Sequence, residues 1–135
     1  MASYTQKALR LRRGKPEEES KMKYLCLVYL EPDKLHAVPD SDCMAFGESL
    51  RIRGRHVAAQ ALQPVHTATT LRVRNGQLLL TDGPFAETKE QLAGFYLIEA
   101  KDLDEAIALA ADIPTARAGS VEVRPIRELA PVAGE

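Results

Sequence analysis

The sequence has 135 residues, of which 27% are charged and 45% hydrophobic, and its 18 Lys and Arg against 19 Asp and Glu give a net charge of −1. This length fits one domain with its own core, and the composition excludes a disordered chain, a collagen-like repeat and a coiled-coil rod. No apolar run approaches the roughly 20 residues that span a bilayer, and no basic surplus favours phosphate contacts, so we expect neither membrane nor nucleic acid as a partner.

Two cysteines, Cys26 and Cys43, are too few for a disulfide framework. The N-terminus also has no apolar signal-peptide core, so we predict a reducing, cytoplasmic location.

Residues 1–21 differ from the rest because they carry a net charge of +3. Their basic run over 9–13 is similar to a transit peptide or a basic arm, but the three glutamates at 17–19 disfavour both interpretations. We predict an extension that is weakly ordered or docked on a neighbouring chain, followed by a domain over 22–129 and a tail over 130–135.

The first expected elements are a strand, a helix and a second strand. Residues 22–30 are apolar on both strand faces, which is typical of a sheet that is covered on both sides. A helix should begin at Asp40 or Ser41 as N-cap and run towards Arg53, with Gly54 as the left-handed residue beyond its end. A strand over 56–62 follows.

The clearest local signal is Asn75-Gly76, which favours a two-residue type I′ hairpin turn. It joins a strand over 70–74 to a strand over 77–81. Alternation along the first of these places Leu71 and Val73 on one face and the two arginines at 72 and 74 on the other.

A strand over 93–99 and a second helix come next. Asp102 is the expected N-cap, and Glu105 completes a variant of the capping box. Helical spacing predicts one buried stripe, formed by Leu103, Ala106, Ile107, Ala110 and Ala111. Pro114 ends this helix, and a last strand over 120–126 should place Val121 and Val123 inward.

This order is β-α-β, a hairpin insert, then β-α-β, which predicts an α+β fold with a ferredoxin-like split β-α-β sheet and both helices on one face. The first strand, however, is apolar on both faces. A second copy of the same sheet would cover the other face, so we predict a homodimer with sheets packed face to face, a dimeric α+β barrel.

Residues 82–90 read DGPFAETKE, nine consecutive residues that closely resemble the signature of the DGPFAETKE proteins, a branch of the YCII-related family. The resemblance covers residues 22–129 and implies a dimeric ferredoxin-like barrel. Most members have no assigned reaction. Some are encoded beside extracytoplasmic-function sigma factors, and relatives include a dehydrochlorinase of chlorinated phenols.

The signature is also the candidate site. Its Asp-Gly-Pro turn can aim the Asp82 carboxylate and the Phe85 ring at the mouth of a cleft. In this interpretation Asp82 is a general base or ligand anchor, Lys89 holds an anionic group and Glu87 adds a ligand contact. Tyr29, with Tyr24 and Tyr96, either lines a ligand pocket between sheets or packs in the core. In the alternative interpretation Asp82 caps an Asx turn, Phe85 fills the core and the remaining residues form a solvated loop.

The resemblance also implies a site that this chain lacks. Enzymatic relatives are thought to pair a His on the first helix with an Asp near the end of the second, and these positions fall at Cys43 and Ile113, with Asp112 one residue earlier. Catalysis by such a pair is therefore not expected. Cys43 is either a thiol with a lowered pKa at a helix N-terminus or a small buried hydrophobe.

We expect no metal and no cofactor, because the three histidines lack ligand spacing and no phosphate-binding glycine loop is present.

The leading hypothesis is a small-molecule-binding protein or enzyme that carries out proton transfer or elimination on a small aromatic or anionic compound near Asp82 and Phe85. The alternative is a non-catalytic accessory protein that acts through a partner such as an extracytoplasmic-function sigma factor. An exposed apolar patch beyond the dimer contact would favour the partner, and a polar-lined pocket of roughly 300 Å³ or more would favour the ligand.

Overall fold

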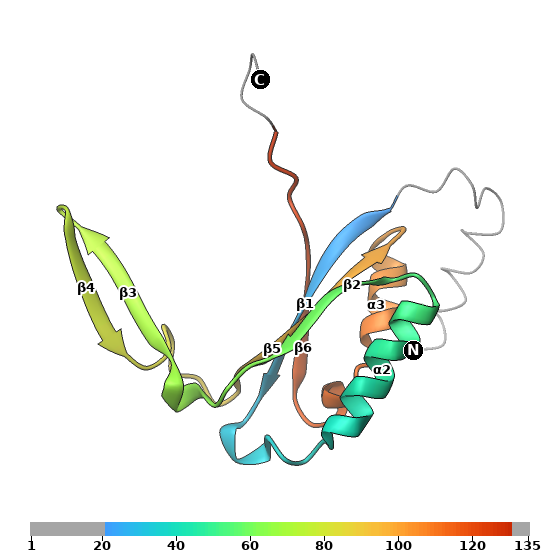
Figure 1. The fold of residues 1–135 in the computed structure, drawn as a ribbon, viewed down its shortest axis with the longest axis horizontal. Helices are drawn as coiled ribbons and strands as arrows, with labels where there is room; N and C mark the ends of the chain where they lie inside the picture. Colours follow the sequence, from blue (N-terminus) through green and yellow to red (C-terminus); the bar gives the residue numbers. More distant parts are fainter. Residues whose placement is uncertain (1–20, 131–135) are drawn as a thin grey trace.

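A computed structural model describes residues 21–130 and shows one four-stranded antiparallel sheet, two helices on one of its faces and a separate hairpin (Figure 1). The strand order is β2-β5-β1-β6, which confirms the predicted ferredoxin-like α+β fold. The elements are β1 (Met22–Leu30), α2 (Asp40–Ile52), β2 (His56–Ala61), β3 (Thr69–Arg74), β4 (Gln77–Asp82), β5 (Gln91–Ala100), α3 (Leu103–Ala110) and β6 (Ser120–Pro125), with short 3-10 turns η2 (Pro32–Lys34), η3 (Val65–Thr67) and η4 (Pro114–Arg117).

The predicted extension over 1–21 and tail over 130–135 lie outside the described residues, except for Lys21 and Ala130. Within the described part of the chain, no helix is both long enough and apolar enough to cross a membrane.

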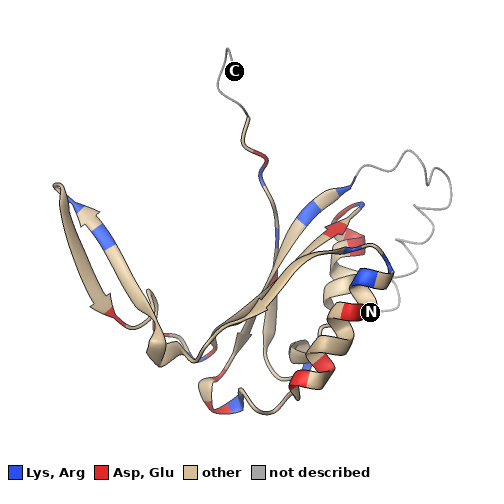
Figure 2. Cartoon of the chain, viewed as in Figure 1, with Lys and Arg blue, Asp and Glu red and all other residues tan. Residues whose placement is uncertain are grey.

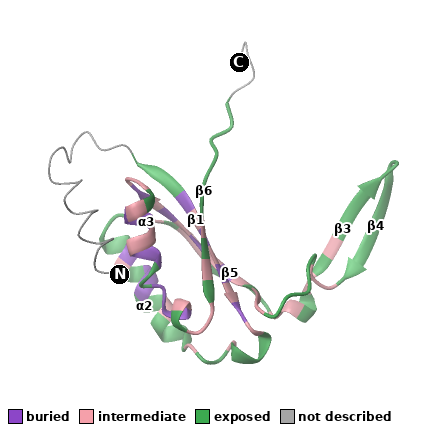
Figure 3. Ribbon diagram, turned by 180° about the vertical axis from the view of Figure 1, so that it is seen from behind, coloured by how far each residue is buried: buried purple, intermediate pink, exposed green. Residues whose placement is uncertain are grey.

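The core lies between the sheet and the two helices. β1 runs through the centre of the sheet, antiparallel to β5 on one side and to β6 on the other. Its alternate residues point towards the helices and are buried, as are those of β5 (Figure 3). Together with residues of α2 and α3 they form one cluster, which includes Tyr24, Cys26, Val28, Leu50, Tyr96, Ile98, Ala106, Leu109 and Ile113.

The opposite face of the sheet has no covering layer in the described chain (Figure 1). Its centre is apolar, because Leu25 and Leu27 of β1 lie beside Phe95 and Leu97 of β5, and all four side chains are half-buried. We call these four residues the open sheet face. Val121 and Val123 of β6 pack on the core side, as predicted.

Helix α2 begins one residue earlier than expected. Pro39, not Asp40 or Ser41, is the N-cap, and no side chain caps this end. The acidic residues instead lie in the first turn, where the helix dipole favours negative charge. The expected end of the helix is confirmed, since Gly54 has φ +72°. The Gly54 N–H donates to the Arg51 carbonyl and the Arg55 N–H donates to the Leu50 carbonyl, as in a Schellman motif.

Helix α3 is capped as predicted, since the Asp102 carboxylate accepts the Glu105 N–H at 2.9 Å. The predicted stripe is partly wrong: Leu103 is 49% exposed and Ala111 is exposed, whereas Glu105 and Leu109 are buried. The reason is electrostatic. The Glu105 carboxylate accepts the Lys101 N–H at 2.7 Å and pairs with the buried Arg55 guanidinium at 2.9 Å, and these bonds turn Glu105 inward.

The β3–β4 hairpin forms its own two-stranded sheet and projects from the body on the side away from the helices (Figure 1). Asn75 and Gly76 have φ values of 51° and 74°, which confirms the type I′ turn. The register places Leu71 opposite Leu80 and Val73 opposite Leu78.

Candidate functional site

The signature segment, residues 82–90, connects β4 at the base of the hairpin to β5. Its first turn is fixed by two hydrogen bonds: the Gly83 N–H donates to the Ala68 carbonyl at 2.7 Å, and the Gly83 carbonyl accepts the Thr70 hydroxyl at 2.8 Å. Gly83 has φ +109°, a conformation that L side chains rarely adopt. The turn therefore requires glycine at this position of the signature.

The other end of the segment is anchored to β6. The Thr88 hydroxyl donates to the Glu90 carbonyl at 2.6 Å, and the Gln91 side-chain amide donates to the Thr88 carbonyl. The Ser120 hydroxyl donates to a Glu90 carboxylate oxygen at 2.7 Å, across 30 residues of sequence. Both ends of the segment are thus tied to the surrounding structure.

Between these anchors, the predicted site residues face solvent. Asp82, Glu87 and Lys89 are exposed, and their charged groups form no hydrogen bond or ion pair with any other residue between 21 and 130. Phe85 is 78% exposed, with the Arg72 guanidinium 5.7 Å from its ring centroid. The alternative in which Phe85 fills the core is therefore wrong.

Charge around the segment is mixed. Figure 2 shows Lys and Arg in blue along the hairpin and an acidic position in red at its base, where Asp82 is the last residue of β4. The segment that follows adds Glu87 and Lys89. A ligand there would meet an aromatic ring, a guanidinium, carboxylates and an ammonium group.

Tyr29 lies on the uncovered side of the sheet, where its hydroxyl donates to Glu122 at 3.2 Å. Partial burial, and then the Glu122 carboxylate, raise the pKa of Tyr29, so the phenol keeps its proton at neutral pH. Tyr29 is also the ladder partner of Ser120, which holds Glu90. We call Tyr29, Glu90, Ser120 and Glu122 the polar cluster.

The structure therefore brings Tyr29 to the end of the signature segment, at Glu90, and no hydrogen bond or ion pair among the described residues joins it to Asp82, Glu87 or Lys89. Sequence reasoning missed Arg72 and three members of the polar cluster as site residues. Alternation along residues 120–124 places Glu122 beside Tyr29 only once the pairing of β1 with β6 is known.

The position of the relatives' histidine is occupied by the half-buried Cys43, which forms a neutral pair with the buried Tyr96. The Cys43 thiol and the Tyr96 hydroxyl share a hydrogen bond, and Tyr96 packs edge-to-face on Phe46 with ring centroids 5.1 Å apart. Burial raises the pKa of Cys43 and raises that of Tyr96 to about 12. The alternative of a lowered Cys43 pKa is therefore wrong, because burial, and then the nearby Asp40 and Asp42 carboxylates, raise the pKa despite the hydrogen bond to Tyr96. Ile113, at the position of the relatives' aspartate, is 1% exposed and part of the same core.

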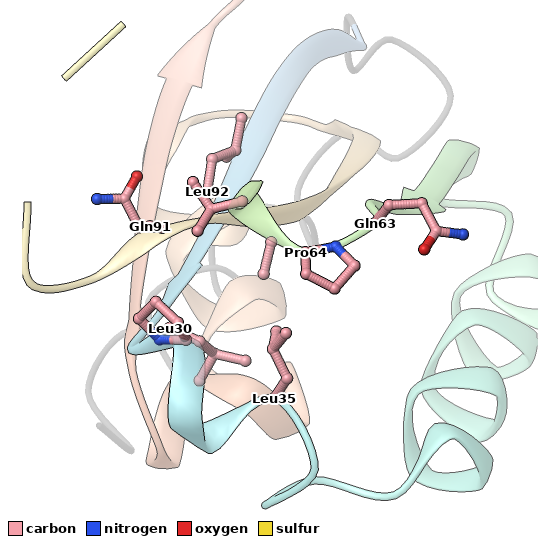
Figure 4. Close-up of a pocket in the computed structure, with 9 residues that line it drawn as sticks. Leu30, Leu35, Gln63, Pro64, Gln91 and Leu92 are labelled. Atoms are coloured by element: carbon pink, nitrogen blue, oxygen red, sulfur yellow. The ribbon is translucent and has the colours of Figure 1, made fainter. Parts of the chain in front are cut away.

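A small depression lies beside the start of β5, between η2 and the β2–η3 connection (Figure 4). Its cavity volume of about 10 Å³ is room for one water. The lining is mostly apolar: Leu30, Pro32, Leu35, Gln63, Pro64, Val65, Gln91, Leu92 and Ala93. This depression is too small for a metabolite.

Comparison with known proteins gives a family but no activity. The model of the YCII-related domain matches residues 22–130. An uncharacterised protein of Rhizobium meliloti (strain 1021) is 54% identical over 67 residues, an alignment that covers 48% of this chain and 54% of that protein. The chain thus spans about half the length of this curated relative.

Proposed function

The chain belongs to the YCII-related family, and from this premise we propose that it is a small-molecule-binding protein or enzyme whose site is the signature segment. One observation carries the proposal. The segment is anchored at both ends, yet between the anchors it presents exposed charged side chains that form no hydrogen bond or ion pair with another described residue. A fixed loop that offers free polar groups on a rigid scaffold is typical of binding and catalytic loops.

The exposed groups define the ligand class. The Phe85 ring and the Arg72 guanidinium beside it can stack on a small aromatic compound, and Lys89 can hold an anionic group. For an enzyme, the chemistry that fits is proton transfer or elimination. Asp82 would accept the proton from the ligand as a general base, and Lys89 would stabilise the negative charge that develops.

We propose that the functional unit is a homodimer in which two open sheet faces pack together. This is supported by the uncovered apolar centre of the sheet. Sheets stacked in this way are about 10 Å apart and share one core. The ligand would then bind at the edge of the interface, where the signature segment lies.

A thermal-shift screen of the full chain against phenolic, carboxylate and phosphate compounds tests the ligand proposal. A ligand at 100 times its Kd stabilises by about 2.7 kcal/mol, a shift that a melting curve resolves. We expect the shift to be lost in Asp82→Asn or Lys89→Ala and kept in Asp112→Asn, a matched change of an exposed aspartate after α3. A shift that survives the first two variants would contradict the proposal.

The second candidate is an accessory protein that acts through a protein partner, for which the resemblance suggests an extracytoplasmic-function sigma factor. The observation that favours it is the exposed apolar face of the hairpin, where Leu71 and Leu80 are 60% and 64% exposed. Titration with a purified sigma factor of this class tests it. Binding that is lost in Leu80→Asp and kept in Asp82→Asn would favour this candidate over the ligand site.

A further inference from the structure

The β3–β4 hairpin is a two-stranded sheet with no third strand and no helix packed on it in the described chain. An isolated hairpin of this kind is marginally stable in water. One face nevertheless carries four apolar side chains in two cross-strand pairs. All four are 58–64% exposed: Leu71, Val73, Leu78 and Leu80. We call these four residues the arm face.

The two faces of the hairpin differ in kind. On the reverse face, Arg72 lies opposite Leu79 and Arg74 lies opposite Gln77 in the neighbouring strand. The two guanidiniums make this face the more polar one, which favours contact with solvent. The hairpin can therefore pack its arm face on an apolar surface and keep both guanidiniums solvated. This amphipathic pattern indicates which face is covered.

The open sheet face is the second apolar surface left uncovered by the described chain. The hairpin projects on that same side of the sheet, opposite the helices (Figure 1). When two open sheet faces oppose each other about a two-fold axis, each hairpin projects on the side of its own sheet that faces the other chain. A second copy thus supplies an apolar partner for both surfaces.

The area that a stable dimer needs also favours a second copy of the chain as the partner that covers the arm face. The residues of the open sheet face are already half-buried, so their remaining accessible area is limited. The arm face adds about 150–300 Å² of apolar surface per chain, against about 800 Å² per partner in a standard interface. The hairpin is therefore a substantial part of the surface available for dimerisation.

We propose that the β3–β4 hairpin is an arm that packs the arm face on a second copy of this chain, so that the signature segment at its base is complete only in the dimer. This inference rests on the proposed homodimer. Asp82 is the last residue of β4, and Thr70 ties the arm to Gly83, so docking of the arm positions the signature segment against the second chain.

Two substitutions of neighbouring leucines test the arm. Leu80→Asp places a charge in the arm face, whereas Leu79→Asp places the same charge on the reverse face of the same strand. By sedimentation velocity of the full chain, we expect Leu80→Asp to raise the Kd of the dimer at least tenfold and Leu79→Asp to change it less than twofold. Equal effects of the two variants would overturn the proposal.

Leu27→Asp in the open sheet face separates failure of the arm from failure of the dimer. If Leu27→Asp dissociates the dimer while Leu80→Asp does not, the sheet-to-sheet dimer stands and the arm proposal is wrong. If the unaltered chain is a monomer at tens of micromolar, the dimer is wrong and the arm with it.

Hydrogen exchange of the unaltered chain gives a measurement that does not depend on how the variants fold. We expect the amides of residues 69–82 to be protected at high protein concentration and to lose protection on dilution through the dimer Kd. Protection that persists in the monomer would mean that the same chain covers the arm face. Absence of protection in the dimer would leave the face free for another protein. Either result would overturn the proposal.

Discussion

At the scale of single residues, burial sets the acid–base behaviour of the core. Cys26 is fully buried, and burial raises its pKa to about 12. Tyr96 behaves in the same way, although its hydroxyl has a hydrogen-bonding partner in Cys43. These groups are neutral at pH 7 and hold their protons more tightly in the folded chain than in the unfolded one.

We therefore predict that stability falls in alkaline solution. The unfolded chain loses the Tyr96 proton near pH 10, whereas the folded chain keeps it until about pH 12, so the stabilisation is complete below pH 10 and is lost as the pH rises to 12. Two pKa units correspond to about 2–3 kcal/mol. Urea unfolding at pH 8, 10 and 11 should show a smaller loss for Tyr96→Phe than for the unaltered chain.

Tyr29→Phe is the control for this measurement. Tyr29 is less buried than Tyr96, and its pKa is raised in part by Glu122, so removal of its hydroxyl should alter the alkaline loss less. An alkaline loss that is equal in both variants would contradict the assignment to Tyr96.

Single residues of the site could be predicted from the sequence only where the chemistry is local. The Asp-Gly-Pro turn was predictable because Gly83 and Pro84 restrict their own backbone. The Ser120–Glu90 hydrogen bond was not, since it joins residues that the strand pairing brings together across 30 positions. The sequence also left Phe85 open between the mouth of a cleft and the core, because one aromatic side chain in a loop has no periodicity.

At the scale of elements, too, features set by adjacent residues could be predicted and features set by distant contacts could not. The hairpin matched its prediction because a type I′ turn is specified by two adjacent residues. The buried face of α3 did not match its prediction, because hydrophobic spacing alone treats Glu105 as a solvent-facing residue. Its inward position depends on Arg55, which lies 50 residues earlier in the connection between α2 and β2.

The Arg55–Glu105 ion pair should therefore be a main link between the α2–β2 connection and the first turn of α3. Its side chains are only 10% and 5% exposed, so removal of one partner leaves an unpaired charge in the interior. We predict that Arg55→Met lowers the free energy of unfolding by about 3–5 kcal/mol in urea titration.

The exposed pair Arg51–Glu48 on α2 is a matched control, since its atoms are 3.0 Å apart, against 2.9 Å for Arg55–Glu105, but its side chains are 57% and 62% exposed. Arg51→Met should cost less than about 1 kcal/mol. If both arginine variants lost the same stability, the importance of burial at Arg55 would be refuted.

At the scale of the whole molecule, the described chain has one packed hydrophobic core and two apolar surfaces that nothing in it covers, the open sheet face and the arm face. The sequence predicted the first of these from the two apolar faces of β1. It did not predict the second, because alternation in the hairpin does not say whether its apolar face meets the body.

A chain of this design should be more stable at higher concentration. We predict that Tm rises as the protein is concentrated from about 1 to 100 μM, because dimerisation stabilises the folded state by mass action. Differential scanning calorimetry at three concentrations measures this. A Tm that does not change over this range would contradict the homodimer.

The central position of β1 has a consequence for synthesis. β1 is the first strand of the domain to be made, yet both of its neighbours come later, and the first residue of β5 lies 61 positions after Leu30. At about 5–20 residues per second, the strand waits roughly 3–12 s on the ribosome before β5 begins to appear. The most apolar segment of the chain is thus exposed longest during translation, and chaperones that bind nascent chains should recognise β1 first.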